Sequence, residues 1–235
     1  MVKRYLHILI FCFLLLNVSA QSELNYNAQM ASVASSGNYS PFWLSANRNG
    51  ISSLDNNWGY LRLGVDGATA LKGDWSLNYG ADVVGGKNLS SDIFVHQAYA
   101  DVSWRWLRLS IGKKQRTGEL KNSALSTGAL VESGNAAPVP QVRIEVPEYR
   151  DFFGTNGWFT LRGHIAYGCF TDGKWQRDWA ADGTRYAENV LYHSKSLFWK
   201  VGDEARFPLT YEGGAQFASQ FGGKVYNMLN RTGDD

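Results

Sequence analysis

The sequence predicts an all-β fold, an antiparallel transmembrane β-barrel of the bacterial outer membrane, and three observations lead to this prediction. Apolar and polar residues alternate with a period of two along segments of about ten residues or more, the length that a tilted strand needs to cross a bilayer. Glycine is abundant, with 25 residues, and recurs inside the apolar segments, which disfavours long helices. Aromatic residues gather near the ends of these segments, as in the interfacial girdles of membrane barrels.

Residues 1–20 have the layout of a secretory signal peptide. Lys3 and Arg4 precede an apolar run over residues 6–16, and Val18-Ser19-Ala20 supplies the small residues that signal peptidase requires. The apolar run is only about half the ~20 residues that a membrane-spanning helix needs, so a cleaved signal is favoured over a permanent anchor. We expect export, cleavage between Ala20 and Gln21, and a barrel domain over residues 21–235.

Charge and cysteine content exclude several classes of protein. The chain has 23 basic and 21 acidic residues, and removal of the signal, which holds two basic and no acidic residues, leaves 21 of each. No basic excess remains to favour nucleic acid. Cys12 lies inside the apolar run of the signal, after Phe11, which argues against a lipoprotein start. Cys169 would then be the only remaining cysteine, so no intramolecular disulfide is possible.

Two hairpins are the clearest local predictions. Residues 58–71 and 75–83 alternate regularly on either side of Lys72-Gly73-Asp74, which is typical of a tight turn. Residues 94–104 and 107–114 form the second pair, joined at Arg105. Further strands are expected over residues 159–167, 190–201 and 211–221, the last one loosened by Gly213 and Gly214.

The strands of a soluble β-sandwich also alternate apolar and polar residues, so the prediction of a barrel depends on two further observations. The polar parity holds the charged residues that a wet lumen accepts, and the strand-end aromatics suit interfacial girdles. The lumen residues expected are Arg62, Asp66, Asp82, Arg162 and Lys195, with Arg162 and Lys195 paired to the aspartates. The girdle residues expected are Trp58, Tyr60, Trp75, Trp104, Trp106, Trp158, Phe159, Phe198 and Trp199.

Two long segments, residues 117–146 and 172–189, are predicted to lie outside the strands. The first contains Pro138 and Pro140, which cannot occupy a central strand because proline lacks the backbone N–H. At about 20 residues per strand and connection, residues 21–235 would supply about ten crossing strands. The polar end at residues 230–235 lacks the apolar-aromatic strand that closes such barrels, so we expect an incomplete, N-terminal part of a larger barrel.

The chain resembles the capsule-assembly Wzi family in its Bacteroidetes form. The resemblance is carried in order by the segments Ser40-Pro41-Phe42-Trp43-Leu44-Ser45-Ala46-Asn47, Ser133-Gly134-Asn135-Ala136-Ala137-Pro138-Val139-Pro140-Gln141-Val142, Gly163-His164-Ile165-Ala166-Tyr167-Gly168 with Phe170-Thr171-Asp172 and Lys174-Trp175, Leu191-Tyr192-His193-Ser194-Lys195-Ser196-Leu197, and Gln220-Phe221-Gly222-Gly223. It implies an outer-membrane barrel on the order of eighteen strands. It also implies a lectin-like, non-enzymatic anchor whose partners are capsular polysaccharide and outer-membrane lipid.

Carbohydrate recognition needs aromatic faces for sugar rings and planar polar groups for hydroxyls. The segment 172–189 combines both, and its candidate residues are Trp175, Trp179, Asp172, Lys174, Arg177, Asp178 and Arg185. The alternative is a solvated loop whose tryptophans lie at the membrane interface. No catalytic, phosphate-binding or metal-binding motif is present in the sequence, and neither a metal nor another cofactor is expected.

Three other functions stay open at this point. A porin-like channel would use the inward charges named above. A hydrolase would need a serine, a histidine and an acid brought together by the fold, with His164 or His193 beside a serine in the lumen. A soluble periplasmic sandwich would need no membrane at all.

Overall fold

A computed structural model of the chain describes residues 22–119, 121, 125–126, 131–171, 175–179 and 184–227. These residues form an open, nine-stranded antiparallel sheet in the order β1-β2-β3-β4-β5-β6-β7-β9-β10. The strands are β1 (Ser22–Ala34), β2 (Asn57–Ala70), β3 (Trp75–Lys87), β4 (Ile93–Trp104), β5 (Leu107–Lys113), β6 (Pro140–Arg150), β7 (Phe159–Cys169), β9 (Leu191–Val201) and β10 (Tyr211–Phe221). The predicted signal peptide lies outside the described residues.

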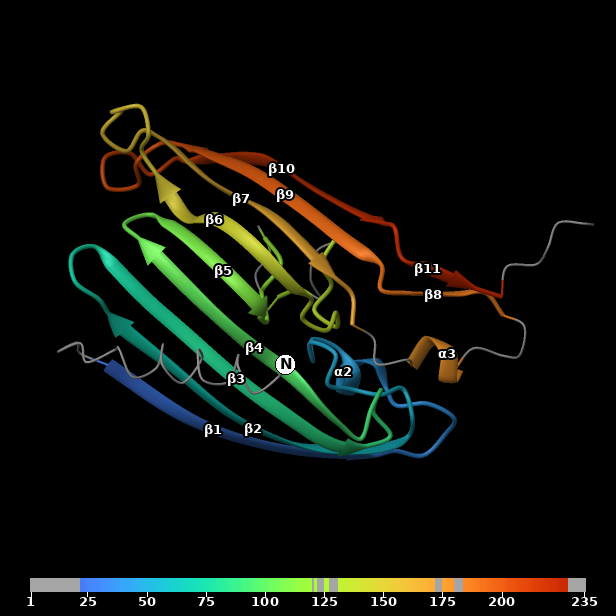
Figure 1. Cartoon of the computed structure of the whole chain (residues 1–235). Coiled ribbons are helices and arrows are strands. Elements are labelled where there is room, and N and C mark those ends of the chain that lie inside the picture. The colour runs from blue at the N-terminus through green and yellow to red at the C-terminus, as the bar shows by residue number, and fades with distance from the viewer. Residues whose placement is uncertain are drawn as a thin grey trace, which may run out of the picture.

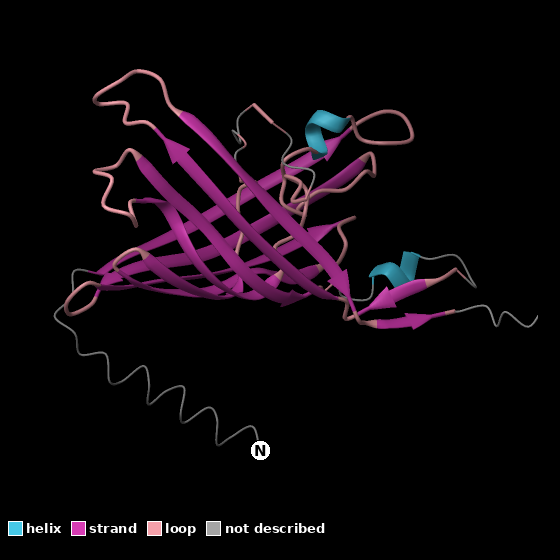
Figure 2. Ribbon diagram, turned by 90° about the horizontal axis from the view of Figure 1, so that it is seen from above, coloured by secondary structure: helices cyan, strands magenta, loops and turns pink. Residues whose placement is uncertain are grey.

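Two short helices and two short strands complete the described structure. Helix α2 (Phe42–Ser45) lies on the concave side of the curved main sheet, together with the described residues of the connection between β5 and β6 (Figure 1). Helix α3 (Trp175–Trp179) and the two-stranded sheet of β8 (Tyr186–Glu188) and β11 (Lys224–Tyr226) lie beside one end of the main sheet (Figure 2). No helix in the described ranges is long and apolar enough to cross a membrane.

The antiparallel β-fold and both predicted hairpins are confirmed. β2 pairs with β3 across the 71–74 turn, and β4 pairs with β5 across Arg105 and Trp106. Arg105 has a φ of 54°, and its guanidinium bonds the Asp74 carboxylate at 2.8 Å, which links the two turns. Among the described residues, nothing pairs with the outer sides of β1 and β10, so these strands form an open sheet and not a closed barrel.

The two faces of the sheet differ sharply in polarity. The convex face carries exposed apolar side chains on nearly every strand, including Met30, Leu63, Ile93, Ile111, Ile144, Ile165 and Leu197. The concave face carries buried polar side chains, including Asp82, His96, Asp101, Ser110, Arg143, His164 and Ser194. This arrangement is the inverse of a soluble protein, in which the exposed face of a sheet is polar.

The connections at the two ends of the sheet differ in length. At the turn end they span residues 71–74, 105–106, 151–158 and 202–210. At the loop end they span residues 35–56, 88–92, 114–139 and 170–190. Paired aromatic rings gather at the turn end: Trp75 with Trp104, Trp106 with Phe152, Phe153 with Phe159, and Trp199 with Tyr211.

Several predictions about individual residues and segments are wrong. Strand β8, for example, lies inside the 172–189 segment that was predicted to lie outside the strands. Trp58 and Tyr60 are not girdle residues, because they are buried with Ile51 and Val84 in a small core on the concave side. Phe198 is also buried, at 3% exposure. Strand β6 begins at Pro140, inside the segment predicted to be loop. A proline is tolerated as the first residue of a strand, since the ladder hydrogen bonds start after it.

The predicted position of Lys195 is also wrong. This residue lies on the convex face, opposite Ile165 of β7 and Phe217 of β10, and its ammonium is 5.7 Å from the Phe217 ring centre. Arg162 does face the concave side, but its guanidinium stacks on the rings of Tyr149 and Phe198 and does not pair with an aspartate. The carboxylate of Asp82 pairs instead with Arg62, at 2.6 Å.

Candidate functional site

Two long loop-end connections fold back onto the concave face and pack against each other. The backbone N–H of Asn49 donates to the Gly134 carbonyl at 2.8 Å, and the backbone N–H of Arg48 donates to Asn135 Oδ1 at 3.1 Å. Gly50 has a φ of 82°, and a Cβ there would lie 2.7 Å from the Cβ of Ala137. Close approach of the two segments therefore requires glycine at this position.

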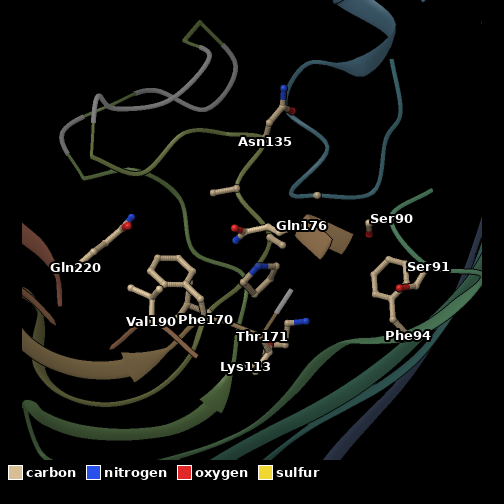
Figure 3. A pocket seen from close by; sticks show the side chains of 15 residues that line it. Ser90, Ser91, Phe94, Lys113, Asn135, Phe170, Thr171, Gln176, Val190 and Gln220 are labelled. Atoms are coloured by element: carbon tan, nitrogen blue, oxygen red, sulfur yellow. The ribbon is translucent and has the colours of Figure 1, made fainter. Parts of the chain in front are cut away.

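A cavity of about 490 Å³ opens where these segments meet the strand ends (Figure 3). This cavity, called here the loop-end pocket, falls within the roughly 300–1,000 Å³ of small-molecule sites. Its apolar walls come from Phe94, Phe170, Pro138 and Val190. Its polar lining comes from the amides of Asn135, Gln176 and Gln220, the hydroxyls of Ser90, Ser91 and Thr171, and from Lys113.

The wall beneath the pocket is held by a polar cluster around Asp82. A β-bulge in β4 places both His96 and Gln97 opposite Asp82. The Asp82 carboxylate bonds Arg62 at 2.6 Å, Gln97 Nε2 at 2.8 Å and His96 Nδ1 at 3.1 Å. His96 Nε2 lies 2.9 Å from the Asn49 carbonyl, so the cluster ties the connection between β1 and β2 to the sheet.

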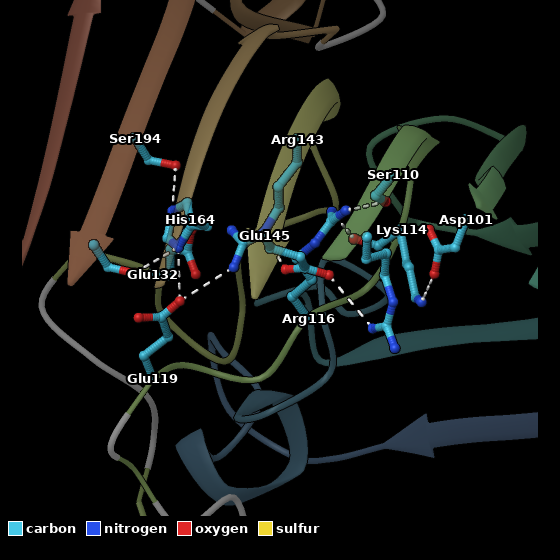
Figure 4. A network of polar contacts seen from close by, with 12 residues as sticks. Asp101, Ser110, Lys114, Arg116, Glu119, Glu132, Arg143, Glu145, His164 and Ser194 are labelled. Atoms are coloured by element: carbon cyan, nitrogen blue, oxygen red, sulfur yellow. Dashed lines mark hydrogen bonds and ion pairs between the residues drawn. The ribbon is translucent and has the colours of Figure 1, made fainter. Parts of the chain in front are cut away.

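A second polar cluster ties the 114–139 connection to β6, β7 and β9 (Figure 4). Glu119 Oε1 lies 2.8 Å from His164 Nδ1 and 3.1 Å from Arg143, whose Nε also donates to Glu145 at 2.6 Å. Burial raises the pKa of Glu119, but hydrogen bonds from His164 and Ser196 and the charge of Arg143 outweigh it and lower the net value. Glu119 is therefore ionised and bound to the wall at neutral pH.

In the same cluster, a serine, a histidine and an acid contact one another in that order in space. His164 Nε2 lies 3.0 Å from Ser194 Oγ, while His164 Nδ1 contacts Glu119, so the arrangement matches the order of a hydrolytic triad. Ser194, however, has 0% exposure, and it pairs with Ala166 in the middle of the sheet. A nucleophile needs an accessible Oγ and unpaired N–H donors for an oxyanion, and a central strand position offers neither.

A smaller cavity of about 320 Å³ lies on the concave wall of β1 to β4. Its lining includes Asn27, Gln29, Arg62, Asp66, Asp82, Gln97 and Tyr99. On the same concave side, the buried atoms Arg62 Nε, Asp101 Oδ1 and Gln216 Nε2 have no hydrogen-bond partner among the described residues.

Five of the predicted carbohydrate residues lie in the described part of the chain, in α3 and just before β8. Arg177 and Asp178 of α3 form an exposed ion pair with each other at 3.0 Å, and Arg185 is exposed before β8. Trp175 and Trp179 begin and end α3. Asp172 and Lys174 lie outside the described residues.

The loop-end pocket draws on residues that the site prediction missed. Five of these residues belong to segments that carry the family resemblance: Asn135, Pro138, Phe170, Thr171 and Gln220. Gln220 lies at the loop end of β10, and the others lie in the connections at that end. Within the predicted 172–189 segment, Gln176 is the one described residue that lines the pocket. Val190, which also lines it, directly follows that segment. The sequence could have predicted this grouping from the strand order. In an antiparallel meander every second connection lies at the same end of the sheet, so these segments could have been expected to meet there.

Within the described ranges, no group of three or more His, Cys, Asp and Glu side chains is placed to hold a metal ion. A scan against protein-family models found no match, and a search of curated proteins found no match either.

Proposed function

We propose that this protein resides in the bacterial outer membrane and binds capsular or exopolysaccharide at its loop end, without catalysis. The observation that carries the proposal is the loop-end pocket, which combines aromatic and proline walls with amides and hydroxyls. The C–H faces of sugar rings pack on aromatic surfaces, and amides can both donate to and accept from sugar hydroxyls. The resemblance to the Wzi family supports the same function.

The membrane location is supported by the polarity of the sheet. An apolar convex face suits lipid, and a polar concave face suits a wet lumen. Three of the four loop-end connections, 35–56, 114–139 and 170–190, are longer than any at the turn end. This difference and the aromatic pairs at the turn end agree with a barrel whose turns face the periplasm and whose loops face the exterior. In this proposal β1 and β10 pair with further strands to close a larger barrel, because two long edge strands in lipid would leave their N–H and C=O groups unsatisfied.

The absence of catalysis is supported by the burial of Ser194. In a hydrolase, substrate would have to reach an Oγ that is fully covered in this structure. We interpret the contacts of His164 with Ser194 and Glu119 as a structural link between the 114–139 connection and the sheet.

Glycan binding by the refolded full chain tests the function. The protein in detergent micelles or lipid vesicles is applied to an array of bacterial surface polysaccharides, and bound glycans are measured again by pull-down. Saturable binding to at least one surface polysaccharide is expected. Failure to bind any of them, with the protein shown to be folded, would count decisively against the proposal.

A porin-like channel is the second candidate, favoured by the polar concave wall and its cavity beside Arg62 and Asp82. Lys195 no longer supports it, because this side chain lies on the convex face. Conductance across planar bilayers separates the candidates. The packed loop-end connections predict little current for a polysaccharide binder, whereas steady single-channel currents would favour the channel.

Replacement of Lys195 with leucine tests the lipid-facing surface. In vesicles the change is expected to raise the free energy of unfolding by up to about 2–4 kcal/mol, the cost of a lysine near the bilayer midplane. The measurement is urea unfolding from vesicles, with Lys72→Leu in the 71–74 turn as the matched control that should show no such gain. Equal effects of the two substitutions would contradict a lipid-facing position for Lys195.

A further inference from the structure

We infer that the loop-end pocket selects an acidic sugar, one that carries a carboxylate such as a hexuronic acid unit. The inference rests on the proposed polysaccharide function and deepens it. It starts from the charge of the lining: Lys113 is a cation, and none of the described residues that line the pocket is a carboxylate.

The position of Lys113 makes its charge usable by a ligand. Lys113 is the last residue of β5 and lies at the floor of the pocket (Figure 3). Its ammonium donates to the Val95 carbonyl at 3.0 Å, which holds the side chain in place. An ammonium has three donors, so this bond leaves capacity for a ligand carboxylate.

The rest of the lining fits a sugar acid better than a bare anion. The amides of Asn135, Gln176 and Gln220 come from different segments and surround the pocket with donors and acceptors. The rings of Phe94 and Phe170 offer apolar faces that an inorganic anion cannot use. One cation with neutral amides matches a ligand with one negative charge per sugar, and an amino sugar would meet an unfavourable like charge.

The experiment compares oligogalacturonate with its methyl ester, which keeps the sugar and removes the charge. Binding of each to the refolded full chain is measured by calorimetry or by fluorescence. Wild type is expected to prefer the acid form. Lys113→Gln should weaken binding of the acid by roughly ten- to hundred-fold, the effect of losing one charge-assisted hydrogen bond, and leave the ester unaffected. Lys113→Arg should restore much of the preference, and this rescue separates lost charge from damaged folding.

Matched variants separate this inference from the proposed function. Phe170→Ala should weaken both ligands, whereas Arg177→Ala in α3, outside the pocket lining, should weaken neither. Binding of neutral surface polysaccharides with no preference for the acid would overturn the acidic-sugar inference and leave the proposed function standing. Tighter binding of a sulfated oligosaccharide than of the carboxylated one would overturn the carboxylate assignment. Binding of no glycan at all would overturn both.

Discussion

Replacement of Asp82 with alanine is expected to lower the free energy of unfolding by about 3–5 kcal/mol, because it breaks a buried ion pair and leaves the partner charge unpaired. The Asp82 side chain is 5% exposed, and the side chain of its ion-pair partner Arg62 is 18% exposed. The variant also removes an acceptor from Gln97 and from fully buried His96. Urea unfolding in detergent micelles, followed by the fluorescence of the nine tryptophans, measures the effect.

Asp74→Ala is the matched control for this change. Asp74 also pairs with an arginine, Arg105, but both side chains are 59% exposed. Exposed pairs contribute about 0–1 kcal/mol, so the control should unfold almost like wild type. If the two variants lost equal stability, the Asp82 cluster would not be the anchor described here.

Replacement of Glu119 with alanine is expected to release the 114–139 connection from the concave wall. The change removes the acceptor shared by His164 and Arg143. Because Arg143 keeps its ion pair with Glu145, the cost is that of leaving buried donors unsatisfied, about 1–3 kcal/mol. Local opening should then expose Lys114, Arg116 and Lys121 to trypsin much more often than in wild type. The rate of cleavage at these sites, read by mass spectrometry, measures the release.

Glu148→Ala is the control, because the Glu148 carboxylate pairs with Arg150 at the turn end and is 72% exposed. It should leave cleavage in the 114–139 connection unchanged. Unchanged cleavage in Glu119→Ala as well would mean that Glu119 does not hold the connection.

The contribution of Glu119 to the free energy of unfolding should also depend on pH and should decrease in acid. The folded-state pKa of Glu119 is lowered from its ordinary value of 4.5, so its contribution is complete above 4.5 and is lost as pH falls through the lowered value. The difference in urea midpoint between wild type and Glu119→Ala should therefore shrink as the pH falls below 4.5. A difference that stays constant down to the lowest pH at which the sheet remains folded would contradict this assignment.

Local sequence rules predicted the hairpins well and the sheet's other features poorly. The 71–74 and Arg105 turns follow from residues within the turns themselves, so alternation and turn chemistry sufficed to predict them. Strand β1 was not predicted, because its many polar residues obscure the alternation, and its ladder with β2 comes from pairing at a distance. Lys195 was predicted to face the lumen because it is charged, whereas the strand register places its side chain on the convex face.

The candidate site was even less accessible to sequence reasoning. The predicted site was one aromatic and charged segment, but the loop-end pocket is assembled from the ends of several connections. Likewise, His164, Ser194 and Glu119 are distant along the chain and meet only because β7 pairs with β9 and the 114–139 connection folds inward.

The sequence by itself determined an antiparallel β-protein with the hairpins and most of the strand parities described above, because alternation and turn chemistry are encoded by neighbouring residues. The tertiary structure alone decided which end of the sheet gathers the long connections, where Trp58 and Lys195 lie, and which polar side chains line the loop-end pocket. These features depend on strand register and on segments that fold back onto the concave face, and both are set by contacts between residues far apart in the chain.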